Sequence, residues 1–267
     1  MTEFTLSVAQ FAATRDTVEN LKAAQTLIAR AGATSDLVVL PENAMYSDPA
    51  HESAGPSYSE SLEGEFVSAL RASASTQKIH VVAGFTETNN DDRPFNTLVH
   101  IDRDGNLAGV YRKIHLYDAF GYRESDTISP APAESPLLFD INGISVGAAT
   151  CYDLRFPEMA RWLVDHSADV ILYPAAWAVG PMKESHWESL IRARAIENTV
   201  YVAAAGQTAP FCTGQSQIVD PMGTTIASAG TEQHGIATAL IRAERIHSAR
   251  ESNPCLLNRR FAVAPRA

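Results

Sequence analysis

Two short stretches from opposite halves of the chain, Asp36-Leu-Val-Val-Leu-Pro41 and Asp169-Val-Ile-Leu-Tyr-Pro174, share one pattern. Each consists of an aspartate, an unbroken apolar run and a proline, which is typical of a strand that is buried on both faces and ends at the proline. A second pair repeats the relationship, because Ile101-Asp-Arg-Asp-Gly105 corresponds to Val219-Asp-Pro-Met-Gly223. These pairs predict that the chain contains two copies of one structural unit.

The residues around these stretches extend the repeat over most of the chain. In each half, short β-branched runs alternate with windows whose apolar residues are three or four positions apart, and a hairpin signal follows. The expected strands are residues 4–11, 37–40, 79–85, 97–101, 107–112, 144–150, 170–173, 200–205, 215–219 and 224–228, and the expected helices are residues 17–30, 64–77, 157–166 and 184–198.

This order of elements predicts the layers of the fold. Helices that follow the strands cover one face of each sheet, and the apolar strands require that the other face is buried too. Two such units can bury these faces against each other. We therefore predict an α/β fold, a four-layer αββα sandwich built from two pseudo-twofold β-α-β-α-β-β repeats. The sequence contains no linker between the halves, so residues 1–267 are expected to form a single domain.

Composition and charge disfavour several classes of partner. Apolar residues make up 45% and charged residues 19% of the chain, as in globular proteins. The 21 basic and 31 acidic residues give a net charge of −10, which argues against binding to nucleic acid or to an anionic membrane. The sequence starts without a signal peptide and lacks the apolar run of about 20 residues that a spanning helix needs, so we expect a cytoplasmic protein.

The cysteine and histidine pattern argues against a bound metal. Three cysteines without C-x-x-C spacing predict neither a disulfide framework nor a zinc knuckle. The H-x-H and H-E-x-x-H clusters of metal-dependent hydrolases are also absent from the sequence. We therefore expect an enzyme without metal or other cofactor. Cys212 and Cys255 lie in no motif, and we interpret both as bystanders.

Three reactive residues follow predicted strands, where sites in open α/β sheets form. Glu42 follows Pro41, Lys113 follows the hairpin strand that ends at residue 112, and Cys151 stands between a strand and a helix. A helix N-terminus favours a thiolate, so Cys151 is a candidate nucleophile. The Lys113 ammonium and the backbone N–H of Tyr152 could hold an oxyanion, and Glu42 could move the protons of an acyl transfer.

Each of these residues also has a structural interpretation. A lone cysteine is more often a small buried apolar residue, a glutamate after proline is usually a turn residue, and a lysine such as Lys113 commonly ends a solvated hairpin. The catalytic interpretation is favoured because all three arrive at strand ends together.

The same residues lie in three motifs that resemble those of the nitrilase superfamily of carbon–nitrogen hydrolases. Leu40-Pro-Glu-Asn43 is similar to the glutamate motif of that family, Tyr111-Arg-Lys-Ile-His-Leu-Tyr-Asp118 to its lysine motif, and Thr150-Cys-Tyr-Asp-Leu-Arg-Phe-Pro-Glu158 to its cysteine motif. The resemblance covers nearly the whole chain, and it implies the αββα sandwich reached above from the repeat.

The resemblance also implies a role for each residue. It makes Cys151 the nucleophile, Glu42 the general base and Lys113 the group that stabilises the oxyanion or donates a proton. Glu124, in Phe120-Gly-Tyr-Arg-Glu-Ser125, corresponds to a second glutamate that orients the triad. Members of the family form homodimers or larger homo-oligomers, and residues 244–267 are expected to form a C-terminal tail at a subunit interface.

The branch of the family is indicated by residues near the cysteine. Nitrilases usually have tryptophan where this chain has Tyr152, which favours amides over nitriles as substrates. The chain is most similar to the Nit amidases, which include ω-amidases and deaminated glutathione amidases. This implies a small-molecule amide as the partner, a thioester intermediate, and candidate substrate-binding residues at Arg155, Trp177 and His186.

Arg155 corresponds to an arginine that holds the substrate carboxylate in N-carbamoyl amino acid hydrolases, and it could equally pair with Asp153 or Glu158 to fix a helix start. Hydrolysis of N-carbamoyl amino acids, or a binding protein that kept the fold without catalysis, are therefore the alternative functions. Two departures from the Nit amidase pattern stand out. Two extra residues precede His186, and Phe261-Ala-Val replaces the usual end of the tail.

Overall fold

The computed structural model describes residues 2–48, 58–90 and 93–265, and its two principal sheets have six strands each. The first sheet has the order β14 (Ile236–Arg242), β1 (Glu3–Ala9), β2 (Leu37–Val39), β3 (His80–Glu87), β4 (Phe95–Ile101) and β5 (Leu107–Arg112). The second has the order β13 (Thr225–Ser228), β12 (Gln217–Val219), β11 (Tyr201–Gly206), β10 (Val170–Ala175), β9 (Ile144–Ala148) and β8 (Leu137–Ile141).

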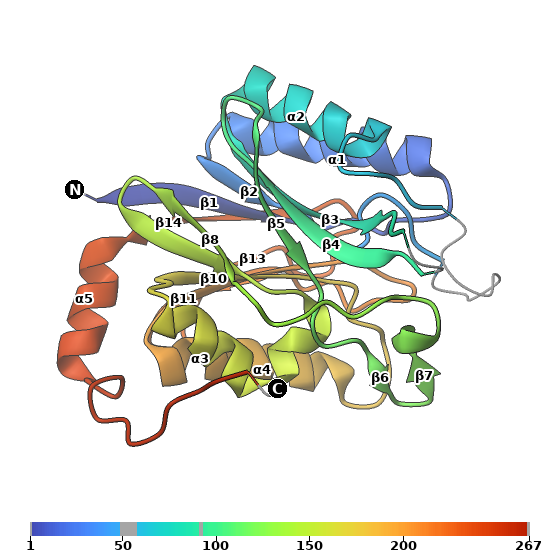
Figure 1. Cartoon of the computed structure of the whole chain (residues 1–267). Coiled ribbons are helices and arrows are strands. Elements are labelled where there is room, and N and C mark those ends of the chain that lie inside the picture. The colour runs from blue at the N-terminus through green and yellow to red at the C-terminus, as the bar shows by residue number, and fades with distance from the viewer. Residues whose placement is uncertain (1, 49–57, 91–92, 266–267) are drawn as a thin grey trace.

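Helices cover the outer face of each sheet, which confirms the predicted αββα sandwich. Figure 1 shows α1 (Thr17–Gly32) and α2 (Glu65–Gln77) over the first sheet, and α3 (Pro157–Asp165) and α4 (Lys183–Asn198) on the far side of the second. Buried apolar residues from both sheets form one cluster, to which Leu6 and Val82 contribute from one side and Val146 and Leu172 from the other. No helix in the described part of the chain has the length and apolarity to cross a membrane.

The helix starts follow ordinary local rules. Asp16 precedes α1, and its carboxylate accepts hydrogen bonds from the N–H groups of Val18 and Glu19. Such a cap satisfies amides that no helical carbonyl can reach, and it typically contributes about 1 kcal/mol. Pro157 opens α3, a position where a missing N–H costs nothing.

The repeat is longer in the structure than the predicted β-α-β-α-β-β unit. Each half ends in the second strand of its predicted hairpin, residues 107–112 and 224–228, so that β3, β4 and β5 correspond to β11, β12 and β13. Two edge strands that the sequence analysis missed also join the sheets. β8 pairs antiparallel with β9, and β14 pairs antiparallel with β1, so β8 and β14 occupy equivalent positions in the two sheets.

The C-terminal segment contains a helix, α5 (Ala243–Ser252), and then an extended run that lies against its own chain. Arg250 pairs with Asp169 at 2.8 Å, and Arg259 pairs with Asp165 of α3 at 2.7 Å. Residues 266–267 of the predicted tail lie outside the described residues. The expectation that this tail packs at a subunit interface stays a prediction.

Candidate active site

Glu42 lies just beyond β2, in a turn that neighbouring backbone holds closely. Gly84 of β3 lies so near that a Cβ there would be 2.6 Å from the Cα of Glu42, so only glycine fits. The Gly84 N–H donates to the carbonyl of Pro41 at 3.1 Å, and the Ala44 N–H donates to the carbonyl of Gly84 at 2.8 Å. The close approach of two backbones therefore fixes the position of the Glu42 side chain.

Lys113 follows β5 and is buried between two glutamates. Its Nζ lies 2.8 Å from Oε1 of Glu42 and 2.8 Å from Oε2 of Glu124, while only 2% of the residue is exposed. Glu124 opens the short 3₁₀ helix η1 (Glu124–Asp126), and its Oε2 also accepts the N–H of Tyr117 at 2.7 Å. The structure thus brings together three of the four catalytic candidates in one ion-pair network.

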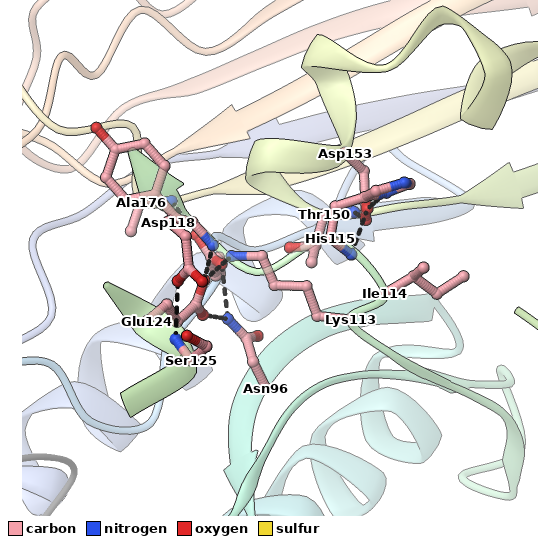
Figure 2. A network of polar contacts seen from close by, with 12 residues as sticks. Asn96, Lys113, Ile114, His115, Asp118, Glu124, Ser125, Thr150, Asp153 and Ala176 are labelled. Carbon is pink, nitrogen blue, oxygen red and sulfur yellow. Dashed lines mark hydrogen bonds and ion pairs between the residues drawn. The ribbon is translucent and has the colours of Figure 1, made fainter. Parts of the chain in front are cut away.

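Asn96 is a member of this network that the sequence analysis missed. It lies on β4, and its Nδ2 donates to Oε1 of Glu42 at 2.7 Å and to Oε1 of Glu124 at 3.0 Å. Figure 2 shows Asn96 and Lys113 directed toward the same group of carboxylate oxygens. Asparagine is a poor strand former. A buried asparagine in the apolar run of β4 is the signal that could have identified it.

Cys151 begins the 3₁₀ helix η2 (Cys151–Arg155) directly after β9 and Thr150. Its φ of 46° lies in the left-handed region, which a non-glycine residue occupies only at a cost of about 1–2 kcal/mol. Thr150 and Asp153 form a capping box that fixes this turn. The Cys151 side chain lies close enough to the Glu42 carboxylate to feel its charge. Strain of this kind in a surrounding structure that enforces it is typical of functional positions.

The buried site changes the pKa of the Cys151 thiol. Burial, and next the charge of Glu42, raise the pKa of the Cys151 thiol well above its ordinary value, so the resting group is a thiol. The helix N-terminus favours a thiolate, but desolvation and a neighbouring carboxylate outweigh the helix dipole in the resting site.

The two partners of the thiol are charged. Burial alone would raise the pKa of Glu42, but the charge and hydrogen bond of Lys113 and the N–H of Ala176 outweigh it and lower that pKa. Burial alone would lower the pKa of Lys113, but Glu124 and Glu42 raise it well above its ordinary value. A carboxylate, an ammonium ion and a neutral thiol therefore meet in one buried site.

A second polar group holds the turn that contains the cysteine. Asp153 accepts hydrogen bonds from the hydroxyl of Tyr111 at 2.6 Å and from the N–H of Thr150 at 2.9 Å, and its Oδ1 lies 2.7 Å from Nδ1 of His115. In Figure 2 Asp153, Thr150 and His115 form a group beside Lys113. His115, two residues after Lys113, thus braces the site from outside the ion-pair network.

The candidate substrate-binding residues also come together. The Arg155 guanidinium lies 4.7 Å from the ring centroid of Trp177, and its Nη2 lies 3.4 Å from Nδ1 of His186. Asp153 makes its hydrogen bonds to other groups, and within the described residues neither Asp153 nor Glu158 pairs with Arg155. The interpretation of Arg155 as an ion-pair partner at the helix start is therefore wrong.

The Tyr152 N–H belongs to the first turn of η2, where amides have no helical acceptor. The remaining cysteines lie elsewhere. Cys212 is buried and its pKa is raised to about 12 by burial, whereas Cys255 is half-buried, with its Sγ 3.6 Å from the carbonyl oxygen of Glu197. Over the residues that the structure describes, no group of three or more His, Cys, Asp or Glu side chains could hold a metal ion.

Comparison with known proteins agrees with this geometry. A family model described as carbon-nitrogen hydrolase matches residues 5–251. The chain is 37% identical over 258 residues to the deaminated glutathione amidase of Escherichia coli O157:H7, a match that covers 96% of this chain and 97% of that protein. It is 33% identical over 273 residues to the omega-amidase NIT2 of Danio rerio, with coverage of 97% and 96%.

A solved structure with 30% sequence identity to this chain has the same fold. The crystal structure of Saccharomyces cerevisiae Nit3, described as a member of branch 10 of the nitrilase superfamily, matches with a TM-score of 0.85 and 30% identity over 97% of each chain. The resemblance to the nitrilase superfamily, and to its Nit members, is thus confirmed. The chain belongs to the carbon-nitrogen hydrolase family and is an enzyme of that class.

Proposed function

We propose that this enzyme hydrolyses a small carboxamide, an ω-amide that bears a carboxylate, to a carboxylic acid and ammonia through a thioester on Cys151. One observation supports this most directly. Glu42 accepts a 2.8 Å hydrogen bond from Lys113, and the charges of both residues act on the buried Cys151 thiol. A nucleophile, a base and a cation in one buried site form a complete set for acyl transfer without a metal.

The first half-reaction forms the thioester. Glu42 takes the thiol proton as the sulfur attacks the amide carbon, and the carbonyl oxygen becomes an oxyanion beside the Lys113 ammonium and the Tyr152 N–H. The carbon–nitrogen bond then breaks, and the proton on Glu42 passes to the leaving nitrogen, which departs as ammonia. Because the resting thiol is neutral, proton removal by Glu42 and attack by the sulfur belong to one step.

The second half-reaction returns the enzyme to its starting state. Glu42 removes a proton from a water molecule as the water oxygen attacks the thioester carbon. The carbon–sulfur bond breaks, the acid is released, and Glu42 returns the proton to the Cys151 sulfur. Glu124 and Asn96 touch Glu42 or Lys113 through hydrogen bonds, so we assign them to the positioning of these two groups.

The experiment that tests this function is ammonia release from a panel of amides. The panel contains α-ketoglutaramate, succinamate, glutaramate and deaminated glutathione, with N-carbamoyl-β-alanine and a simple nitrile as contrasts. Hydrolysis of deaminated glutathione releases an amine instead of ammonia, so for this substrate the released amine is measured. Turnover of an ω-amide that falls by several orders of magnitude in Cys151→Ala supports the proposal. Undiminished activity in that variant contradicts it.

Two other functions give different outcomes in the same assays. An N-carbamoyl amino acid hydrolase, favoured by the position of Arg155 near the cysteine, would release carbon dioxide together with ammonia from N-carbamoyl-β-alanine. A binding protein without catalysis would leave Cys151 inert toward iodoacetamide. We expect alkylation of Cys151 that is lost in Glu42→Gln, while the half-buried Cys255 reacts equally in both proteins.

A further inference from the structure

Lys183 is a buried cation without a carboxylate partner. It is the first residue of α4, and only 5% of it is exposed. Its Nζ donates to the Tyr117 hydroxyl at 2.6 Å and lies 4.0 Å from the ring centroid of Phe120. Burying an unpaired charge is costly, and an aromatic face recovers only part of that cost. We therefore expect an anion to bind next to the Lys183 ammonium.

Arg155 supplies a second cation at the same aromatic rings. Its guanidinium lies 5.3 Å from the centroid of Phe120 and 4.7 Å from that of Trp177, and Lys183 lies 5.8 Å from the latter. The Nε of Arg155 is buried and has no hydrogen-bond partner. Over the described residues, neither cation forms an ion pair with an acidic side chain. Two positively charged side chains thus lie against the same aromatic rings, Phe120 and Trp177, and the Nε donor of Arg155 is unused.

Their surroundings connect these cations to the reacting groups. The Tyr117 N–H donates to Glu124, which holds Lys113, and the Tyr117 ring packs edge-on against Tyr152 with centroids 5.2 Å apart. Arg155 ends η2, the same short helix that Cys151 begins. Burial, and next the charge of Arg155, lower the pKa of Lys183, while the ionised form of Cys151 acts in the opposite direction. Lys183 therefore lies within electrostatic reach of the nucleophile.

We propose that Lys183 supplies a second positive charge, beside Arg155, to the subsite for the carboxylate at the far end of the acyl chain. The Arg155 fork presents two parallel N–H donors to a carboxylate, and Lys183 adds a point charge that the Tyr117 hydroxyl holds in place. This inference rests on the proposed amidase function and adds to it a residue that selects amides with a terminal carboxylate over neutral amides. Lys183 also lies in the stretch between Gly180 and Trp187, where the sequence departs from the Nit amidase pattern.

The test compares a charged amide with a neutral amide of the same shape. Succinamate and 4-oxopentanamide differ in that a methyl ketone replaces the carboxylate. For Lys183→Met we expect kcat/KM to fall about 10–100-fold for succinamate and less than about 3-fold for 4-oxopentanamide, since a charge-assisted hydrogen bond is lost only with the former. Lys183→Arg should restore most of the activity. Lys22→Met, which removes an exposed charge on α1, is the matched control and should behave like the unmodified protein.

Equal losses on the two amides, or no loss on either, would overturn the subsite. Direct binding separates this failure from failure of the proposed function. Calorimetry with Cys151→Ala should show binding of succinamate that weakens about 10–100-fold when Lys183→Met is added. If the unmodified protein hydrolyses no amide but this binding is seen, the proposed function fails and the subsite stands. If amides are hydrolysed but succinamate binds equally with and without Lys183, the subsite alone fails.

Discussion

The hydroxyl of Tyr111 donates a 2.6 Å hydrogen bond to Oδ2 of Asp153, and it thereby joins β5, which leads to Lys113, to the turn that begins with Cys151. Tyr111→Phe removes this bond and leaves a buried carboxylate with one donor fewer. We expect the free energy of unfolding to fall by about 1–3 kcal/mol, measured in urea. We also expect kcat to fall more than KM changes, because the oxyanion donor and the nucleophile lose their shared brace. A variant that is less stable but has unchanged kcat would show that the bond is structural only.

Asn96 links the two glutamates, so its removal should change the acid–base behaviour of Glu42. Hydrogen bonds to a carboxylate favour its charged form and lower its pKa. In Asn96→Ala the pKa of Glu42 should therefore rise, and the acid limb of kcat/KM against pH should move to higher pH. The measurement is a pH profile with succinamate between pH 4 and 9. A lower activity at every pH without displacement of the limb would contradict this role.

Lys113 makes the stability of the site depend on pH in a specific direction. In the unmodified protein it lowers the pKa of Glu42, so this stabilisation is present above the ordinary carboxyl pKa and is lost as the pH falls through the lowered value. In Lys113→Met, two buried glutamates face each other without a cation. The pKa of Glu42 should rise, and the variant should become more stable as the pH falls from 8 to 5.

At pH 7 we expect Lys113→Met to cost about 3–5 kcal/mol of unfolding free energy, which is typical of a broken buried ion pair. Adding Glu42→Gln removes one of the two unpaired charges and should recover part of this loss. Urea denaturation at several pH values checks both statements. A pH dependence that matches the unmodified protein would show that Lys113 does not control the ionisation of these carboxyl groups.

Binding of a carboxylate by Lys183 should weaken in alkaline solution. The contribution of Lys183 is present below its pKa and lost above it, and burial together with Arg155 lowers that pKa from the ordinary lysine value. Tyr117, the other group that faces Lys183, has a pKa raised by burial and by Cys151.

The measurement is the dissociation constant of succinamate with Cys151→Ala between pH 7 and 10, which removes the thiol from the titration. In the Lys183→Arg version of the same protein, the loss should move to higher pH, because a guanidinium does not titrate there. The same alkaline limb in both proteins would assign it to another group.

The C-terminal tail gives a prediction about assembly. Leu257 and Phe261 are apolar but 87% and 89% exposed, which favours a second subunit as their partner. We predict that light scattering shows a homodimer. When both residues are replaced by serine, the dimer should be weaker and should dissociate at a higher protein concentration. Val18→Ser, at an exposed apolar residue on α1, is the control and should leave the dimer intact. A monomeric unmodified protein at micromolar concentration would contradict this prediction.

The sequence was sufficient for groups that lie at strand ends. Glu42, Lys113 and Cys151 each follow a strand, so the chain itself places them at one edge of the fold. Asn96 could not be located in this way, because it lies within a strand and its partners are 54 and 28 residues away. Lys183 was missed for the same reason, as its hydrogen-bond partner Tyr117 is 66 residues distant.

Properties that depend on burial, such as the protonation state of Cys151, also could not be predicted from the sequence. A helix start that favours a thiolate can be read from the sequence, but the protonation of Cys151 depends on desolvation and on a carboxylate from the other half of the chain. The edge strands β8 and β14 were missed because their partners cannot be read locally. Only Ala237 and Ile241 of β14 are buried, and its partner β1 lies at the opposite end of the sequence.

The pairing of β14 with β1 has a consequence for the newly made chain. Glu3 lies opposite Arg242. The first strand to leave the ribosome, β1, can therefore pair with β14 only after nearly the whole chain has been made. Until residues 236–242 have been synthesised, β1 has an open edge of unpaired N–H and C=O groups, which is the feature that most readily recruits another chain. Premature termination before this strand should therefore give aggregates rather than a smaller folded enzyme.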